Sequence, residues 1–111
     1  MPLYQSVTYA SGTTGTQPSI NMDPSIAPFN ATIAVTLTGG TTSFKMQWSI
    51  SPFETVSDAN ANWFDSTDIP ASSAASKTSF VTTPYARVRL VIASLSGGNL
   101  VLETQQGISK N

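Results

Sequence analysis

Two apolar runs of strand length on either side of a glycine turn constrain the fold of this chain more than any other feature. Residues 85–103 read YARVRLVIASLSGGNLVLE, and Ser-Gly-Gly-Asn separates the two runs. Successive strand side chains point to opposite faces, so the apolar residues should face a core while Arg87 and Arg89 point away from it. The glycine pair supplies the positive φ that a tight turn needs. The pattern predicts a β-hairpin with one buried and one solvated face.

The same alternation recurs in residues 29–50, on both sides of a Thr-Gly-Gly-Thr-Thr turn, and predicts a second hairpin. Leu3–Tyr9 fits an edge strand and 77–82 a further short strand, and no run has the 3.6-residue period of a helix. The fold class predicted is therefore all-β, an antiparallel two-sheet β-sandwich of jelly-roll or immunoglobulin-like type. The predicted core comprises Ile33, Val35, Leu37, Phe44, Met46, Trp48, Phe80, Val88, Leu90, Ile92, Leu100 and Leu102.

The chain has 111 residues, enough for one domain with a single core. Residues 1–28 are expected to form a first strand followed by an extended surface segment, since three prolines interrupt regular pairing there. Residues 29–106 should form the sandwich and 107–111 a C-terminal tail. The 10–28 segment is read either as a long loop or as an arm that reaches a neighbouring subunit.

Composition excludes several classes of function. A net charge of −1 with only five Lys and Arg argues against nucleic-acid binding, which needs clustered cations. No apolar run approaches the ~20 residues that span a membrane, and the start shows no basic region followed by an apolar run, so a soluble protein outside the general export route is expected. The chain has no cysteine and hence no disulfide or thiolate metal site.

Catalysis is not indicated, because the chain lacks both His and Cys, the common general base and thiol nucleophile. A polar loop holds four of the six acids, but nothing there promises the burial that a glycosidase acid needs. The run Asp58-Ala-Asn60-Ala-Asn62 imitates the start of a calcium loop and then departs from it. An irregular calcium site stays open as an alternative, and no catalytic, cofactor or metal residue is assigned. The four acids are Glu54, Asp58, Asp65 and Asp68.

Two surface patterns are candidate binding sites. Trp63 and Phe64, with Phe53 nearby, could form an aromatic platform for a glycan, or Trp63 could fold back over the edge of the core. Cations on the outer sides of their strands, together with Tyr4 on the edge strand, could form a partner interface that complementary charge orients, or simply a solubilising face. The cations are Lys45, Arg87 and Arg89.

Several motifs over residues 29–106 resemble small β-sandwich structural proteins of tailed bacteriophages. They are Lys45-Met-Gln-Trp48-Ser-Ile50-Ser, Asn62-Trp63 after a polar loop, Pro84-Tyr85-Ala-Arg87-Val-Arg89-Leu and Ser94-Leu-Ser-Gly-Gly98. The chain has Ser51-Pro52 where such proteins often carry Asp-Gly, so that loop is expected to differ. The resemblance implies a virion component of the capsid decoration, cement or head-fibre type, and it carries over no catalytic residue.

The function expected from the sequence is thus non-enzymatic. The chain would be made in the host cytoplasm and would stabilise the capsid exterior by binding the major capsid protein or another virion protein, with homo-oligomers left open. The alternatives are a carbohydrate-binding host-attachment module of a phage fibre, which would use Trp63 and Phe64, and a tail or neck adaptor.

Overall fold

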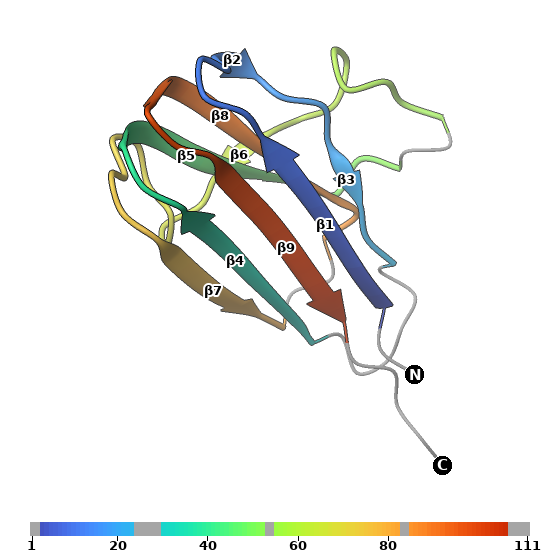
Figure 1. The fold of residues 1–111 in the computed structure, drawn as a ribbon. Coiled ribbons are helices and arrows are strands. Elements are labelled where there is room, and N and C mark those ends of the chain that lie inside the picture. The colour runs from blue at the N-terminus through green and yellow to red at the C-terminus, as the bar shows by residue number, and fades with distance from the viewer. Residues whose placement is uncertain (1–2, 24–29, 53–54, 83–84, 107–111) are drawn as a thin grey trace.

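The computed structural model describes residues 3–23, 30–52, 55–82 and 85–106. Figure 1 shows two antiparallel sheets packed face to face, with no helix in this part of the chain, and the predicted all-β two-sheet sandwich is confirmed. Accordingly, no helix among these residues could cross a membrane. The strands are β1 (Leu3–Tyr9), β2 (Gly15–Thr16), β3 (Ile20–Asn21), β4 (Ala31–Leu37), β5 (Thr41–Ser49), β6 (Phe64–Asp65), β7 (Lys77–Val81), β8 (Arg87–Ser96) and β9 (Leu100–Gln106).

The strands form two sheets. Sheet A has the order β1-β9-β4-β7, and sheet B has the order β2-β8-β5-β6, with β3 also paired to β8. All of these pairs are antiparallel. The first strand lies at an edge, as predicted, and β7 forms the other edge of sheet A.

Both predicted hairpins are wrong in the same way. The strands β8 and β9 belong to different sheets, as do β4 and β5, so each glycine turn is an arch that carries the chain from one sheet to the other. Each strand pairs instead with a strand of the other arch, β4 with β9 and β5 with β8. The pairs on either side of the turns are Leu37 with Leu100 and Thr41 with Ser96, so the two arches cross at one end of the sandwich.

The crossing of the arches requires glycine. A Cβ on Gly40 would lie 2.0 Å from the carbonyl oxygen of Ser96, and one on Gly98 would lie 2.1 Å from the carbonyl oxygen of Gly39. Both distances are far below van der Waals contact, and the obstructing atoms are backbone. Hydrogen bonds between Thr38 and Asn99, at 3.0 to 3.2 Å, join the two turns directly.

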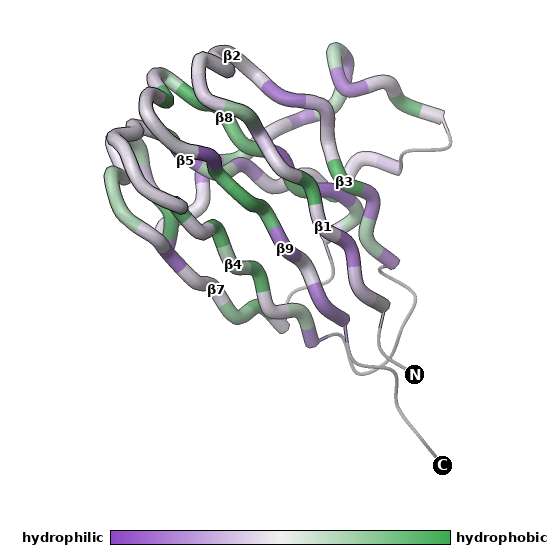
Figure 2. Tube along the Cα trace, in the orientation of Figure 1, coloured by the Kyte–Doolittle hydropathy of each residue, from purple (hydrophilic) through white to green (hydrophobic). Residues whose placement is uncertain are grey.

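The core between the sheets is built by period-two alternation along the central strands, which Figure 2 shows as apolar residues recurring along β4, β5, β8 and β9. Of the predicted core, Leu37 is only partly buried, and the prediction for Phe80 is wrong. The other ten predicted residues are confirmed as buried: Ile33, Val35, Phe44, Met46, Trp48, Val88, Leu90, Ile92, Leu100 and Leu102.

Strand register explains the error at Phe80. This residue lies opposite Thr32, whose side chain faces outward, and is 63% exposed. Its neighbour Ser79 lies opposite the buried Ile33 and is only 4% exposed. On an edge strand the alternation is fixed by the partner, so a serine occupies the inward position and a phenylalanine the outward one.

Residues 10–23 do not form a separate surface segment, which corrects the prediction for that part. Strands β2 and β3 lie along β8, and their pairing is interrupted around Pro18. Ile20 and Met22 are buried in the core. The rest of the predicted arm, residues 24–28, and the predicted tail 107–111 lie outside the described residues.

The arch crossing yields a stability test with a matched control. Gly98→Ala should lower the free energy of unfolding by about 3 kcal/mol, because its methyl group overlaps the Gly39 carbonyl. Gly39→Ala meets no atom within 4 Å and should cost only about 1 kcal/mol for its positive φ of 116°. Urea denaturation followed by tryptophan fluorescence measures both, and equal costs would contradict the crossing.

Candidate binding surfaces

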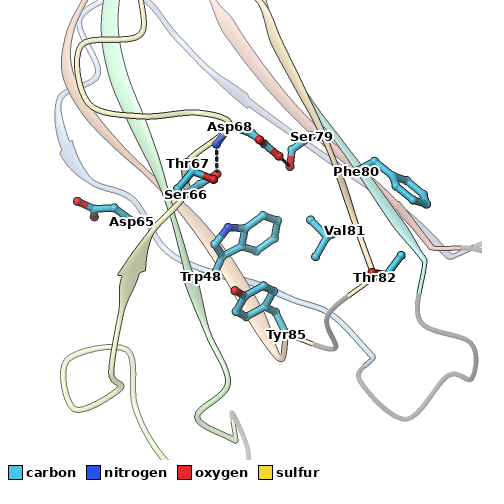
Figure 3. A pocket seen from close by; sticks show the side chains of 10 residues that line it. All are labelled: Trp48, Asp65, Ser66, Thr67, Asp68, Ser79, Phe80, Val81, Thr82 and Tyr85. Carbon is cyan, nitrogen blue, oxygen red and sulfur yellow. Dashed lines mark hydrogen bonds between the residues drawn. The ribbon is translucent and has the colours of Figure 1, made fainter.

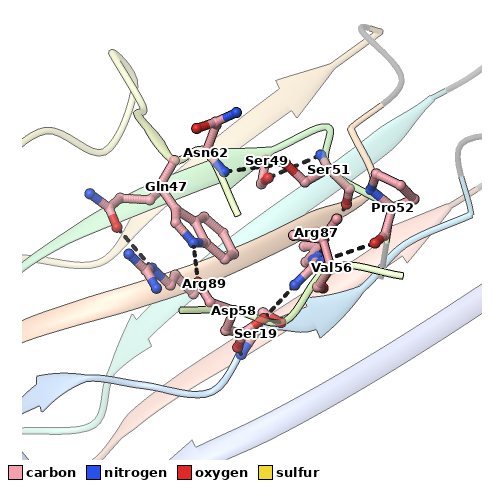
Figure 4. A network of polar contacts seen from close by, with 11 residues as sticks. Ser19, Gln47, Ser49, Ser51, Pro52, Val56, Asp58, Asn62, Arg87 and Arg89 are labelled. Atoms are coloured by element: carbon pink, nitrogen blue, oxygen red, sulfur yellow. Dashed lines mark hydrogen bonds and ion pairs between the residues drawn. The ribbon is translucent and has the colours of Figure 1, made fainter. Parts of the chain in front are cut away.

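A buried arginine organises the outer face of sheet B. Arg87 points away from the core, as predicted, but its side chain is only 2% exposed because the described part of the 51–63 loop, residues 51–52 and 55–63, folds over it (Figure 4). Its guanidinium donates to the carbonyl oxygens of Ser51 at 3.2 Å, Pro52 at 3.0 Å and Val56, and to Asp58 Oδ1 at 2.7 Å. The prediction of Arg87 as a solvent-facing partner contact is therefore wrong. Its donors are used within the chain.

Asp58 joins a third segment to this network. Its carboxylate accepts hydrogen bonds from the Ser19 amide at 3.0 Å and the Ser19 hydroxyl at 2.7 Å, besides the pair with Arg87. Burial would raise the pKa of Asp58, but the hydrogen bonds from Ser19 and Arg87 and the Arg87 charge outweigh burial and hold the pKa below its ordinary value of 3.8. The 51–63 loop, β8 and the segment before β3 are thus fastened at one point.

Arg89 is held on the same face by an aromatic ring. Its Cζ lies 3.9 Å from the centroid of the Trp63 ring, and its Nε donates to Gln47 Oε1 at 2.8 Å. The Trp63 indole N–H donates to the Asp58 carbonyl at 3.0 Å. Burial is the main cause that lowers the pKa of Arg89 from its ordinary value, with Asp58 opposing it. One face of Trp63 is therefore occupied by the guanidinium.

The remaining charges of this face are also paired. Lys45 Nζ lies 3.2 Å from Asp65 Oδ1, and Gln47 Nε2 donates to the same oxygen at 2.9 Å. These contacts, that of Gln47 first, lower the pKa of Asp65. The strands that carry the three cations, β5 and β8, lie in one sheet, as a shared basic face required. Two acids of the loop, Asp58 and Asp65, however, lie against cations instead of at a separate acidic end.

The aromatic platform is not formed by Trp63 and Phe64 together. Trp63 lies against Arg89 on the outer face, whereas Phe64 pairs with Trp48, whose side chain faces the core. Cross-strand partners share a face, so Trp63 and Phe64 point to opposite sides. Phe64 is 58% exposed at the sheet edge. Phe53, the third member of the platform, lies outside the described residues.

The acids of the loop do not converge on one site. Asp58 pairs with Arg87, Asp65 with Lys45, and Asp68 accepts a hydrogen bond from Ser79 at 2.7 Å. Within the described ranges no three His, Cys, Asp or Glu side chains are grouped to hold a metal ion. Glu54 lies outside those ranges.

The outer face of sheet A is different in character. One row of paired residues crosses all four strands, Tyr4 to Gln105 to Thr32 to Phe80. The two aromatic side chains at its ends are 56% and 63% exposed. Among the outward positions of these strands Glu103 is the only charged residue, and Tyr4 donates to its carboxylate at 2.6 Å, which raises the pKa of the tyrosine.

A cleft of about 300 Å³ opens at the side of the sandwich, between the segment that follows β6 and strand β7 (Figure 3). Trp48 and Tyr85 stack in it, with ring centroids 4.7 Å apart and planes inclined by 12°. Sequence analysis missed this cleft, because Trp48 has the pattern of an ordinary core residue. The lining comprises Trp48, Asp65, Ser66, Thr67, Asp68, Ser79, Phe80, Val81, Thr82 and Tyr85.

No protein-family model matches this sequence, and no curated protein matches it. Among solved structures, the chain is similar to one from the Bacillus endospore appendages, described as a family of disulfide-linked pili. The identity is 11%, the match covers 98% of this chain and 88% of that chain, and the TM-score is 0.45. The present chain has no cysteine with which to form a disulfide.

The Arg87 network makes a prediction about the loop above it. Arg87→Met removes the donors to three carbonyl groups and the partner of Asp58, and should lower the free energy of unfolding by about 3 kcal/mol. Limited proteolysis should then cut within residues 55–63, which should resist cleavage in the native protein. Arg89→Met, which loses chiefly the contact with Trp63, should cost about 1 kcal/mol and leave the loop protected. Equal proteolysis of both variants would contradict this assignment.

The lowered pKa of Asp58 predicts a pH dependence. A carboxyl group whose folded pKa lies below its unfolded value stabilises the protein above the unfolded pKa and loses that contribution as pH falls through the folded one. Asp58→Asn should therefore be less stable than the native protein at pH 7, and the difference should shrink below about pH 4. Urea midpoints at pH 7, 5 and 3 measure it. Asp65 titrates in both proteins, so its contribution cancels in the comparison. A stability difference that does not change with pH would contradict the prediction.

Proposed function

We propose that this chain is a non-enzymatic structural protein that binds a protein partner through the outer face of sheet A. The row from Tyr4 to Phe80 carries the proposal. Central regions of protein interfaces are depleted of charged residues and enriched in aromatic ones. This face combines two exposed aromatic side chains with short Ser, Thr and Ala side chains and a single carboxylate, so a partner can approach it at little cost in desolvation.

The outer face of sheet B is less suited to the same task. Each of its three cations already contacts a residue of the polar segment that follows β5: Lys45 contacts Asp65, Arg87 contacts Asp58, and Arg89 contacts Trp63. A partner that recruited Arg87 would have to break an ion pair whose cation is buried, which is costly. A partner that recruited Lys45 or Arg89 would have to displace the contact with Asp65 or with Trp63. Partner binding through Lys45 and Arg89 is therefore less favourable than binding through sheet A.

The more specific proposal is a virion component on the capsid exterior, bound to the major capsid protein. Its support is the sequence resemblance to bacteriophage β-sandwich proteins and a chain in which only 10% of the residues are charged. A tail or neck adaptor would use the same face at a different copy number. Counting copies per purified particle separates the two, because a decoration protein should follow the number of capsid subunits.

The proposal predicts the effect of one exposed residue. Phe80→Ser should weaken binding to purified capsids at least tenfold, since an aromatic contact worth about 1.4 kcal/mol or more is lost. The side chain is 63% exposed, so the free energy of unfolding should change by no more than about 0.5 kcal/mol. A co-sedimentation assay with increasing protein concentration measures the affinity.

Phe64→Ser is the matched control, because Phe64 is exposed to a similar extent, 58%, but lies at the edge of sheet B. It should bind like the native protein. Equal losses in the two variants, or no loss in either, would rule out sheet A as the binding face. Analytical ultracentrifugation of the free protein tests whether the partner is a second copy of the chain.

A further inference from the structure

The cleft beside β7 has the size and shape of a small-molecule site. Its volume of about 300 Å³ lies at the lower end of the range for ligand pockets, about 300–1,000 Å³. Figure 3 shows the stacked rings of Trp48 and Tyr85 between two walls. Residues 66–68 form one wall, and residues 79–81 of β7 together with Thr82 form the other.

The indole of Trp48 carries a donor that the described part of the chain leaves unused. Trp48 is only 5% exposed, yet its N–H makes no hydrogen bond among the described residues, whereas that of Trp63 does. In the described part of the chain, the Tyr9 hydroxyl is the only side-chain polar atom that is both fully buried and unpaired. The Trp48 nitrogen, which is also unpaired, is therefore not fully buried. The Trp48 side chain lines the cleft. A buried indole N–H normally finds an acceptor, and a ligand oxygen in the cleft would supply one.

The walls supply complementary groups. Asp68 Oδ2 accepts from the Ser79 hydroxyl at 2.7 Å, and Oδ1 has no bond among the described residues, so it can accept from a ligand hydroxyl. Exposed hydroxyl groups of Thr67 and Thr82 can both donate and accept. Among the described residues no Lys or Arg lines the cleft, whereas the Asp68 carboxylate does, which disfavours an anionic ligand. Asp65 borders the cleft with its backbone, and its carboxylate is turned toward Lys45.

We propose that this cleft binds one ring of a neutral saccharide. A pyranose presents vicinal hydroxyl groups that donate to a carboxylate and accept from an indole N–H, and its C–H face packs against aromatic surface. The proposed site differs in place from the Trp63 and Phe64 platform, since it depends on Trp48, Tyr85 and Asp68. With the proposed protein-binding row on the outer face of sheet A it shares only Phe80.

Two indole resonances make the proposal measurable by NMR. The chain has two tryptophans, and Trp63→Phe assigns the remaining signal to Trp48. The methyl glycosides of glucose, galactose, mannose and N-acetylglucosamine, titrated separately to 50 mM, are the probes. At least one should shift the Trp48 indole signal saturably while the Trp63 signal of the native protein stays in place.

A carboxyl-to-amide pair provides matched variants. Asp68→Asn should weaken the binding at least tenfold, because the amide replaces a charged acceptor at the ligand. Asp65→Asn makes the same chemical change at a carboxylate that points away from the cleft toward Lys45, and should bind like the native protein (Figure 3). If Asp68→Asn loses its native amide dispersion, Thr67→Val serves in its place and should also weaken binding.

Four results would overturn the proposal. The first is the absence of a saturable Trp48 shift with all four glycosides, and the second is a shift confined to Trp63. The third is equal weakening in the Asp68 and Asp65 variants. A saturable response to tetramethylammonium with none to the glycosides would also overturn it, since it would mark a cation site.

Discussion

The sandwich depends on the point where its two arches cross. The chain passes from β4 to β5 and from β8 to β9 at the same end of the sandwich. The two strands that pair in sheet A, β4 and β9, are therefore connected directly to the two strands that pair in sheet B, β5 and β8. The two backbones touch there, which only Gly40 and Gly98 allow. The four central strands are thereby linked both by covalent connections between the sheets and by hydrogen bonds within them. The remaining strands, β1, β7, β2, β3 and β6, are added at the edges of this unit.

Arg87 holds in place a long polar loop that has little hydrophobic core of its own. Removing a guanidinium from water is costly unless nearly all its donors are satisfied, and here three carbonyl groups and the Asp58 carboxylate satisfy them. Since Asp58 also binds Ser19, one cation fixes the loop, β8 and the start of β3 together. The same network explains why sheet B offers few free charges to a partner.

Sequence predicted the longer strands and most of the core, because period-two alternation is a local property, but not the two-residue strands β2, β3 and β6. It failed where the outcome depends on distant contacts. A glycine turn between two apolar runs fits a hairpin and an arch equally well, and which one forms is decided by the other arch about 60 residues away. Phe80 was assigned to the core from its hydrophobicity, whereas Ile33 across the ladder places Ser79 there. The burial of Arg87 and the unpaired indole of Trp48 follow from loops whose positions no local pattern encodes.

The two proposed binding regions meet at β7. Phe80 ends the aromatic row on the outer face of sheet A and also borders the cleft, while its neighbour Ser79 faces inward and holds Asp68. An edge strand of five residues, paired on one side only, therefore separates the proposed protein-binding face from the proposed sugar site. Ligands at the two sites would contact opposite faces of one short strand, and any shift of β7 that improves one contact must move the groups that form the other. Coupling of this kind is reciprocal, because each ligand changes the affinity for the other by the same factor.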